Sequence, residues 1–155
     1  MNKSRTYALF LGAVVLVAVN GVAQEKKIKR SDLPAPVEKT VAAESAGATI
    51  RGFSEEKENG ATYYEVELMV NGHGRDVSID KTGAIVEVEE EVTVDTLPAA
   101  VKEGLTAKAG KGKIAKVESI TKHNKLVAYE AEVATGGKKS EVQVGPDGKP
   151  LDHEE

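Results

Sequence analysis

An internal repeat constrains the fold of this chain more than any single motif does. The stretch "LPAPVEKTVAAESAG" begins at Leu33, and the similar stretch "LPAAVKEGLTAKAG" begins at Leu97. A second match places "YEVELMVNGHGRDVSIDKTGAI", from Tyr64, over "YEAEVATGGKKSEVQVGPDGKP", from Tyr129. Inserting one residue between the two blocks aligns both matches, so we interpret the chain as two tandem copies of one structural unit.

Each copy is predicted to begin with a helix. Ser31 or Asp32 can cap the first helix, and prolines are tolerated in its first turn because the amides there have no intrahelical partner. Gly47 ends the first helical pattern, and Gly104 interrupts the second. The apolar residues that recur at helical spacing are Leu33, Val37, Val41 and Ala42 in the first copy and Leu97, Val101 and Leu105 in the second.

The rest of each copy alternates between apolar and polar residues, which indicates strands with one buried face. In "YYEVELMV", the residues Tyr64, Val66 and Leu68 are expected to point toward a core, and in the second copy Tyr129, Ala131 and Val133 are expected to do so. The opposite face is predicted to be solvated and acidic. It is our candidate partner-binding face, with the residues Tyr63, Glu65, Glu67, Glu130, Glu132 and Glu141.

The predicted fold class is α+β. We expect two tandem repeats, each a helix plus a four-stranded antiparallel meander, over residues 32–92 and 93–155. A unit of about 60 residues with few aromatics is marginally stable alone. The two meanders are therefore expected to join into one curved sheet, with both helices packed on one face.

The N-terminal region resembles a secretory signal. Lys3 and Arg5 precede the uncharged apolar run "YALFLGAVVLVAV", and small residues precede an expected cleavage site after Ala23. The run is short for a membrane span, so retention as an anchor is the less favoured alternative. We therefore predict a signal peptide over residues 1–23, a flexible tail over residues 24–31, and a secreted or periplasmic protein with no stable membrane anchor.

The combined motifs resemble the PepSY-like repeats of secreted bacterial proteins. The resemblance rests on the leading "LP" helix, "YYEVEL", the glycine turn, "DVSID" and "KTGAIV", and it extends from Leu33 to Leu151. Tandem PepSY-like repeats are similar in fold to beta-lactamase inhibitor protein. The resemblance implies a non-catalytic binding module outside the cytoplasm, one that binds or inhibits a protein or peptidase and needs no cofactor.

The stretch "VNGHGRDVSIDKTG" could be mistaken for a catalytic or metal-binding loop. The pair Asn71-Gly72 is typical of a tight hairpin, and Lys138 takes the place of His73 in the second copy. The chain has no cysteine, no Gly-x-Ser-x-Gly motif and no pair of histidines at ligand spacing. These observations predict a protein that is not an enzyme and holds no metal or cofactor.

The net charge and the distribution of positive residues argue against a nucleic-acid partner. The formal net charge is -4, and positive residues do not cluster as a nucleic-acid footprint requires. A partner is expected to be a protein or peptide, for which the acidic rows could provide complementary charge. The alternative is that the acidic face binds cations, or that the protein is structural in the envelope, without inhibitory activity.

Overall fold

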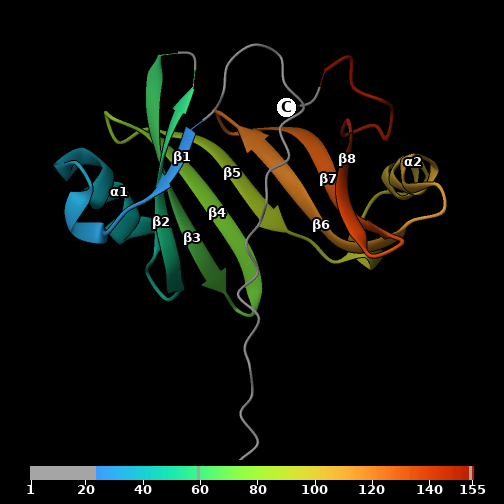
Figure 1. Ribbon diagram of the computed structural model, residues 1–155, viewed down its shortest axis with the longest axis horizontal. Coiled ribbons are helices and arrows are strands. Elements are labelled where there is room, and N and C mark those ends of the chain that lie inside the picture. Colours follow the sequence, from blue (N-terminus) through green and yellow to red (C-terminus); the bar gives the residue numbers. More distant parts are fainter. Residues whose placement is uncertain (1–23, 59, 154) are drawn as a thin grey trace, which may run out of the picture.

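The computed structural model describes residues 24–155 except residues 59 and 154, and the expected signal peptide lies outside the described residues. Within the described residues, eight antiparallel strands form one sheet in chain order, so each strand pairs with its sequence neighbours (Figure 1). The strands are β1 (Gln24–Lys27), β2 (Thr49–Glu58), β3 (Ala61–Val70), β4 (His73–Asp80), β5 (Ile85–Glu91), β6 (Lys113–Lys122), β7 (Lys125–Thr135) and β8 (Lys138–Val144). The predicted α+β class and the single joined sheet are confirmed.

In the described part of the chain two helices flank the strands, each preceded by a short 3-10 turn. Helix α1 (Ala35–Glu44) follows the turn Arg30–Asp32, and helix α2 (Ala99–Ala109) follows Val94–Thr96. A proline occupies the N-cap position of both helices. The predicted cap at Ser31 or Asp32 is therefore wrong, because these residues belong to the 3-10 turn, where the Asp32 carboxylate accepts a hydrogen bond from the Lys29 amide at 3.0 Å.

Each helix covers its own hydrophobic cluster, and the two clusters lie at opposite ends of the sheet (Figure 1). Val77 pairs with Val88, and Val88 pairs with Thr121, so the helix-covered face continues from β4 to β6. The cluster under α1 contains Val37, Val41, Val66, Leu68, Val77 and Ile79. The cluster under α2 contains Leu97, Val101, Leu105, Val117, Ala131, Val133 and Val144. The predicted core residues of both helices are buried, except that Leu33 is half-buried and Ala42 is exposed.

Two expectations about strand content are wrong. The segment predicted as a flexible tail over residues 24–31 instead contributes β1, which pairs with β2 from Gln24↔Lys57 to Lys27↔Ser54. Main-chain hydrogen bonding to the edge of β2 outweighs the polar composition of this segment. Helix α2 is followed by three strands and not four, because the described residues after β8 turn at Gly145 and form no further strand.

The turns at the ends of β4 and β8 pack against the helices. At Gly83, φ is +88° and an added Cβ would lie 2.7 Å from the Pro36 carbonyl oxygen, so only glycine fits there. Thr40 donates from Oγ1 to the Gly83 carbonyl at 2.6 Å. An added Cβ at Gly148 would overlap the Ala100 carbonyl in the same way. These contacts fix each helix against the strand pair it covers.

The hairpin prediction at His73 is confirmed. Asn71 and Gly72 connect β3 to β4 with φ of 51° and 89°, and His73 is the exposed first residue of β4. None of the helices in the described part of the chain is long and apolar enough to cross a membrane.

Candidate functional site

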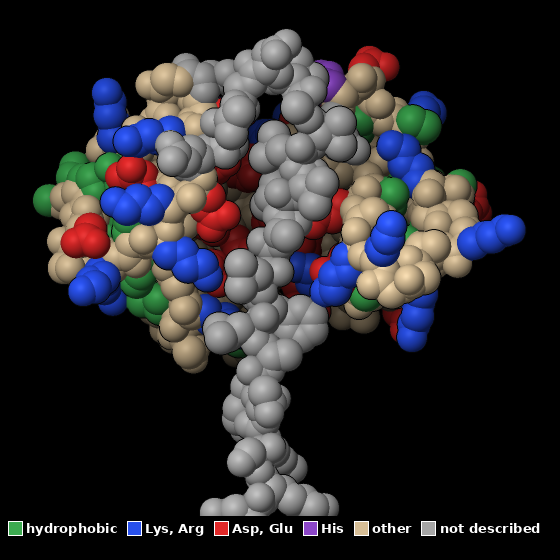
Figure 2. Space-filling view, viewed as in Figure 1, with side chains coloured by type: hydrophobic (Ala, Val, Ile, Leu, Met, Phe, Trp, Pro, Cys, Tyr) green, Lys and Arg blue, Asp and Glu red, His purple; other side chains and the backbone are tan. Residues whose placement is uncertain are grey.

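The sheet face opposite the helices is lined with carboxylates. Because side chains alternate along each strand, the register brings Glu67 beside Asp76 and Asp76 beside Glu89, and likewise Glu118 beside Glu130. Figure 2 shows Asp and Glu side chains gathered in a hollow between the two ends of the molecule. We call this surface the acidic face and define it by Glu65, Glu67, Asp76, Glu87, Glu89, Glu118, Glu130, Glu132 and Glu141.

All five predicted glutamates lie on this face, but the two repeats do not place them side by side. Glu65 and Glu67 are on β3 and Glu130 and Glu132 are on β7, so three strands separate the two pairs. The intervening strands supply four carboxylates that the sequence analysis did not include: Asp76, Glu87, Glu89 and Glu118. The alternation in "AIVEVEEE" and "KVESITK" could have identified three of them.

The prediction that this face is fully solvated is wrong. Among its nine carboxylates only Glu141 is exposed, and Glu118 keeps 7% of its surface accessible. Ile120 pairs with both Glu89 and Ala128 on the same face, and both apolar residues are buried. Curvature and these apolar neighbours reduce the contact of the central carboxylates with water.

Burial and mutual repulsion change the protonation of these groups. Burial, reinforced by the charge of Asp76, raises the pKa of Glu65 to about 8. Burial, with the charges of Glu87 and Glu118, raises the pKa of Glu89 to about 9. The same causes raise the pKa of Asp76 to about 6 and that of Glu130 to about 7. The face therefore binds protons near neutral pH.

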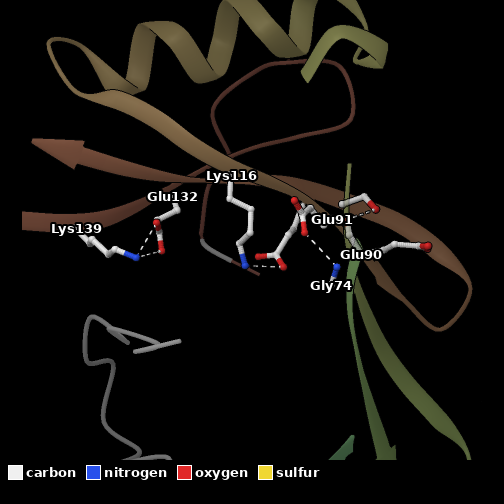
Figure 3. Close-up of polar contacts among 8 residues, drawn as sticks. Gly74, Glu90, Glu91, Lys116, Glu132 and Lys139 are labelled. Carbon is white, nitrogen blue, oxygen red and sulfur yellow. Dashed lines mark hydrogen bonds and ion pairs between the residues drawn. The ribbon is translucent and has the colours of Figure 1, made fainter. Parts of the chain in front are cut away.

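Three lysines partly balance the carboxylates. Lys116 lies 2.8 Å from Glu118, Lys122 lies 3.3 Å from Glu87, and Lys139 lies 3.0 Å from Glu132. Figure 3 shows Lys116 and Lys139 directed toward their carboxylate partners. Burial lowers the pKa of Lys116, but the hydrogen bond to Glu118 and the charges around it outweigh this effect and leave the pKa raised. Among the described residues, no ion pair reaches Glu65, Asp76 or Glu89.

Three carboxylates converge at the centre of the face. One carboxylate oxygen each from Asp76, Glu89 and Glu118 lies within 4.8 Å of the others. These three residues come from β4, β5 and β6, so the continuous sheet is what brings them together. Such a group could hold a divalent cation, which prefers oxygen ligands.

Uncharged side chains and main-chain groups also lie against the carboxylates of the acidic face. Gly52 makes room for Glu67, since an added Cβ would lie 3.0 Å from the Glu67 Oε1 atom. Gln143 donates to Glu130 at 2.8 Å, and the Glu155 amide donates to Gln143 at 2.9 Å. Tyr63, the sixth predicted residue, pairs with Asp80 and Glu56 and lies half-buried, away from the central carboxylates.

No protein-family model matches the chain, and no curated protein matches it. Solved structures do share its fold. A proposed periplasmic protein from Bacteroides eggerthii superposes with a TM-score of 0.60 at 20% identity, over 77% of this chain and 86% of that chain. A BLIP-like protein from Bacteroides fragilis superposes with a TM-score of 0.56 at 20% identity, over 77% of this chain and 83% of that chain. A DUF2874 family protein from Bacteroides ovatus superposes with a TM-score of 0.58 at 18% identity, over 77% of this chain and 85% of that chain. The expected likeness to the beta-lactamase inhibitor protein fold is confirmed.

Proposed function

We propose that this protein is a non-catalytic, PepSY-like binding module of the periplasm or the extracellular space, and that it holds a protein partner on its acidic face. One observation supports this most strongly: the face crosses the sheet from β3 to β8, and both helices lie on the opposite side. A concave sheet surface that is free of helices, with carboxylates from six strands, suits a positively charged partner. The fold shared with a BLIP-like protein and with a proposed periplasmic protein agrees with this function and location.

Tight inhibition of a beta-lactamase is not part of this proposal. Hot spots in tight interfaces are enriched in aromatic residues. The described residues contain Phe53, Tyr63, Tyr64 and Tyr129, and Tyr64 and Phe53 pack against the α1 cluster while Tyr129 packs against the α2 cluster. Only Tyr63 remains beside the acidic face, so charge is the main source of recognition here.

Affinity capture with neutralised variants tests the proposal. Glu65, Glu67, Glu130 and Glu132 are replaced together by glutamine, which keeps side-chain volume and removes charge. The control replaces Glu90, Asp95 and Glu103, which are exposed and outside the acidic face, by their amides. Proteins captured from a periplasmic extract by wild type should be retained by the control and lost by the first variant. Equal capture and equal affinity for the two variants would contradict the proposal.

A second candidate function, cation binding, is favoured by the group Asp76, Glu89 and Glu118, whose oxygens approach within 4.8 Å. Titration of the purified protein with Ca²⁺ and Mg²⁺ tests it. Saturable binding that Asp76→Asn weakens by about tenfold or more would support this function. Absence of heat and of any shift in melting temperature at about 10 mM cation would exclude it.

A further inference from the structure

Strand β8 forms one edge of the sheet. Within the described residues it pairs with β7 alone, and its residues from Lys138 to Glu141 are exposed, whereas its last two residues are buried. The chain after β8 lies against this buried end, because the Glu155 amide donates to the Gln143 side chain at 2.9 Å and the Gly145 amide donates to the Lys149 carbonyl at 2.8 Å. The accessible part of the edge is therefore residues 138–142.

The hairpin before β8 sets the direction of its main-chain groups. Gly136 and Gly137, with φ of 58° and 80°, form a two-residue turn, and such a turn closes on a hydrogen-bonded pair, here Thr135 and Lys138. Since hydrogen-bonded positions alternate along an antiparallel strand, Ser140 also directs its amide and carbonyl toward β7. The intervening residues, Lys139 and Glu141, direct theirs toward the outer edge.

The accessible stretch is complementary to a second copy of itself. Ser140 is its middle residue, and Lys139 and Glu141 on either side carry opposite charges. Antiparallel pairing of two β8 strands about Ser140 puts each Lys139 opposite Glu141 of the other copy, in pairs whose main-chain groups face each other. The registers on either side of this one put Glu141 opposite Glu141, or Lys139 opposite Lys139. Charge therefore selects a single register.

We propose that two copies of this chain pair antiparallel along β8, about a two-fold axis through Ser140, to form one continuous sheet. Residues opposite each other in an antiparallel pair share a face, so the acidic faces of the two copies become neighbours. Lysines on an edge strand commonly prevent such pairing, but here each Lys139 meets a carboxylate. A contact of this length is small, so the dimer should be weak, with a Kd of about 0.1–1 mM. It does not depend on a partner at the acidic face.

Sedimentation equilibrium of the purified protein, from about 10 µM to about 2 mM, tests this contact. Wild type should change from monomer to dimer over this range. Lys139→Glu puts two carboxylates opposite each other in both pairs, and Glu141→Lys puts two ammonium groups there, so each variant should raise the Kd by about tenfold or more. The matched controls are Lys108→Glu and Glu103→Lys, at exposed positions of α2, and both should dimerise as wild type does.

Mixing the two edge variants gives the sharpest test. In a dimer of one Lys139→Glu chain and one Glu141→Lys chain, both pairs again join opposite charges, so an equimolar mixture should dimerise as wild type does. The double variant that carries both substitutions should do the same. Lys139 also lies 3.0 Å from Glu132 within its own chain, so thermal melts must first show that each variant is folded.

Three results would overturn the proposal. A protein that stays monomeric at every concentration has an edge that its lysines protect. A dimer that both edge variants retain is held together elsewhere. Dimerisation lost in both variants and not recovered in their mixture rules out the register about Ser140. A monomer that captures an extended segment of another protein, and loses it in Lys139→Glu but not in Lys108→Glu, would assign the edge to a foreign strand and exclude the second copy.

Discussion

The Lys116 ammonium lies 2.8 Å from a carboxylate oxygen of Glu118, the most buried carboxylate of the acidic face, which is 7% accessible, while the Lys116 side chain is 41% exposed. Removing one partner of a buried pair leaves the other charge unbalanced, whereas an exposed pair contributes little. Because this pair lies at the centre of the face, replacing its lysine tests how much the charges of the face contribute to the free energy of unfolding.

Lys116→Met should lower the free energy of unfolding at neutral pH by about 1–3 kcal/mol, because Glu118 would lose its counter-charge. The pKa of Lys116 is raised in the folded protein, so its contribution is fully present below the ordinary lysine pKa and is lost only above it. Urea denaturation measures the change. The control is Lys139→Met, whose partner Glu132 has a side chain 24% exposed against 10% for that of Glu118, and which should cost less than about 1 kcal/mol. Equal costs for the two variants would contradict a special role for Lys116.

Glu89→Gln should stabilise the protein at alkaline pH. The pKa of Glu89 is raised to about 9 by burial and by Glu87, so the folded protein holds this proton more tightly than the unfolded chain does. The stability from this group is full below its ordinary pKa and is lost as pH rises toward about 9. Thermal melts near pH 9 should show a gain of about 1–3 kcal/mol, and melts near pH 4 should show almost none. A gain that is independent of pH, or that Glu103→Gln reproduces, would be inconsistent with this explanation.

Gly148→Ala should destabilise the protein for two reasons: alanine is strained at positive φ, and its Cβ would overlap helix α2. Gly148 has φ of +78°, and an added Cβ would overlap the Ala100 carbonyl of α2. Gly47 has the same φ with nothing within 4 Å, so Gly47→Ala isolates the conformational cost, about 1 kcal/mol. Chemical denaturation should show a further loss of about 1–3 kcal/mol for Gly148→Ala. Indistinguishable midpoints would mean that the turn moves away from the helix at little cost.

Removal of β1 should expose the main-chain groups of β2. Pairing runs from Gln24↔Lys57 to Lys27↔Ser54, and the Ile28 amide extends it by donating to the Phe53 carbonyl at 3.0 Å. A chain that begins after Ile28 should aggregate more readily, because the uncovered edge can pair with another chain. Light scattering at raised temperature measures this. Replacing Lys26 and Lys27 by glutamine keeps the strand and controls for loss of charge; if that variant aggregates as fast, charge and not pairing is responsible.

Periodicity predicted most of the fold, and the failures have specific physical causes. Val66, Leu68, Val101 and Leu105 alternate or recur as a buried face must, and the structure buries them all. The segment "QEKK" has the composition of a solvated tail, and only the unpaired edge of β2, which is remote in sequence, makes it a strand.

The acidic face was predicted in composition but not in its electrostatics. Alternation placed Glu65 and Glu130 on the polar side correctly. It could not show that Asp76, Glu89 and Glu118 converge from three strands, because their distance depends on sheet register and curvature. The pKa values of Asp76 and Glu89 are raised by burial and by the charges of neighbouring strands. Neither cause can be recognised in the sequence of one strand alone.

The sheet is continuous, but the hydrophobic cluster under α1 is separate from the one under α2. Within the described part of the chain they are joined by the pairing of β5 with β6, from Glu87↔Lys122 to Glu91↔Glu118, extended by hydrogen bonds at Val92 and His123. Each cluster lies under its own helix, away from most of this ladder, so amide hydrogens along the ladder should exchange before those of the strands under the helices. We therefore expect two cooperative unfolding units, one under each helix, coupled through the pairing of β5 with β6.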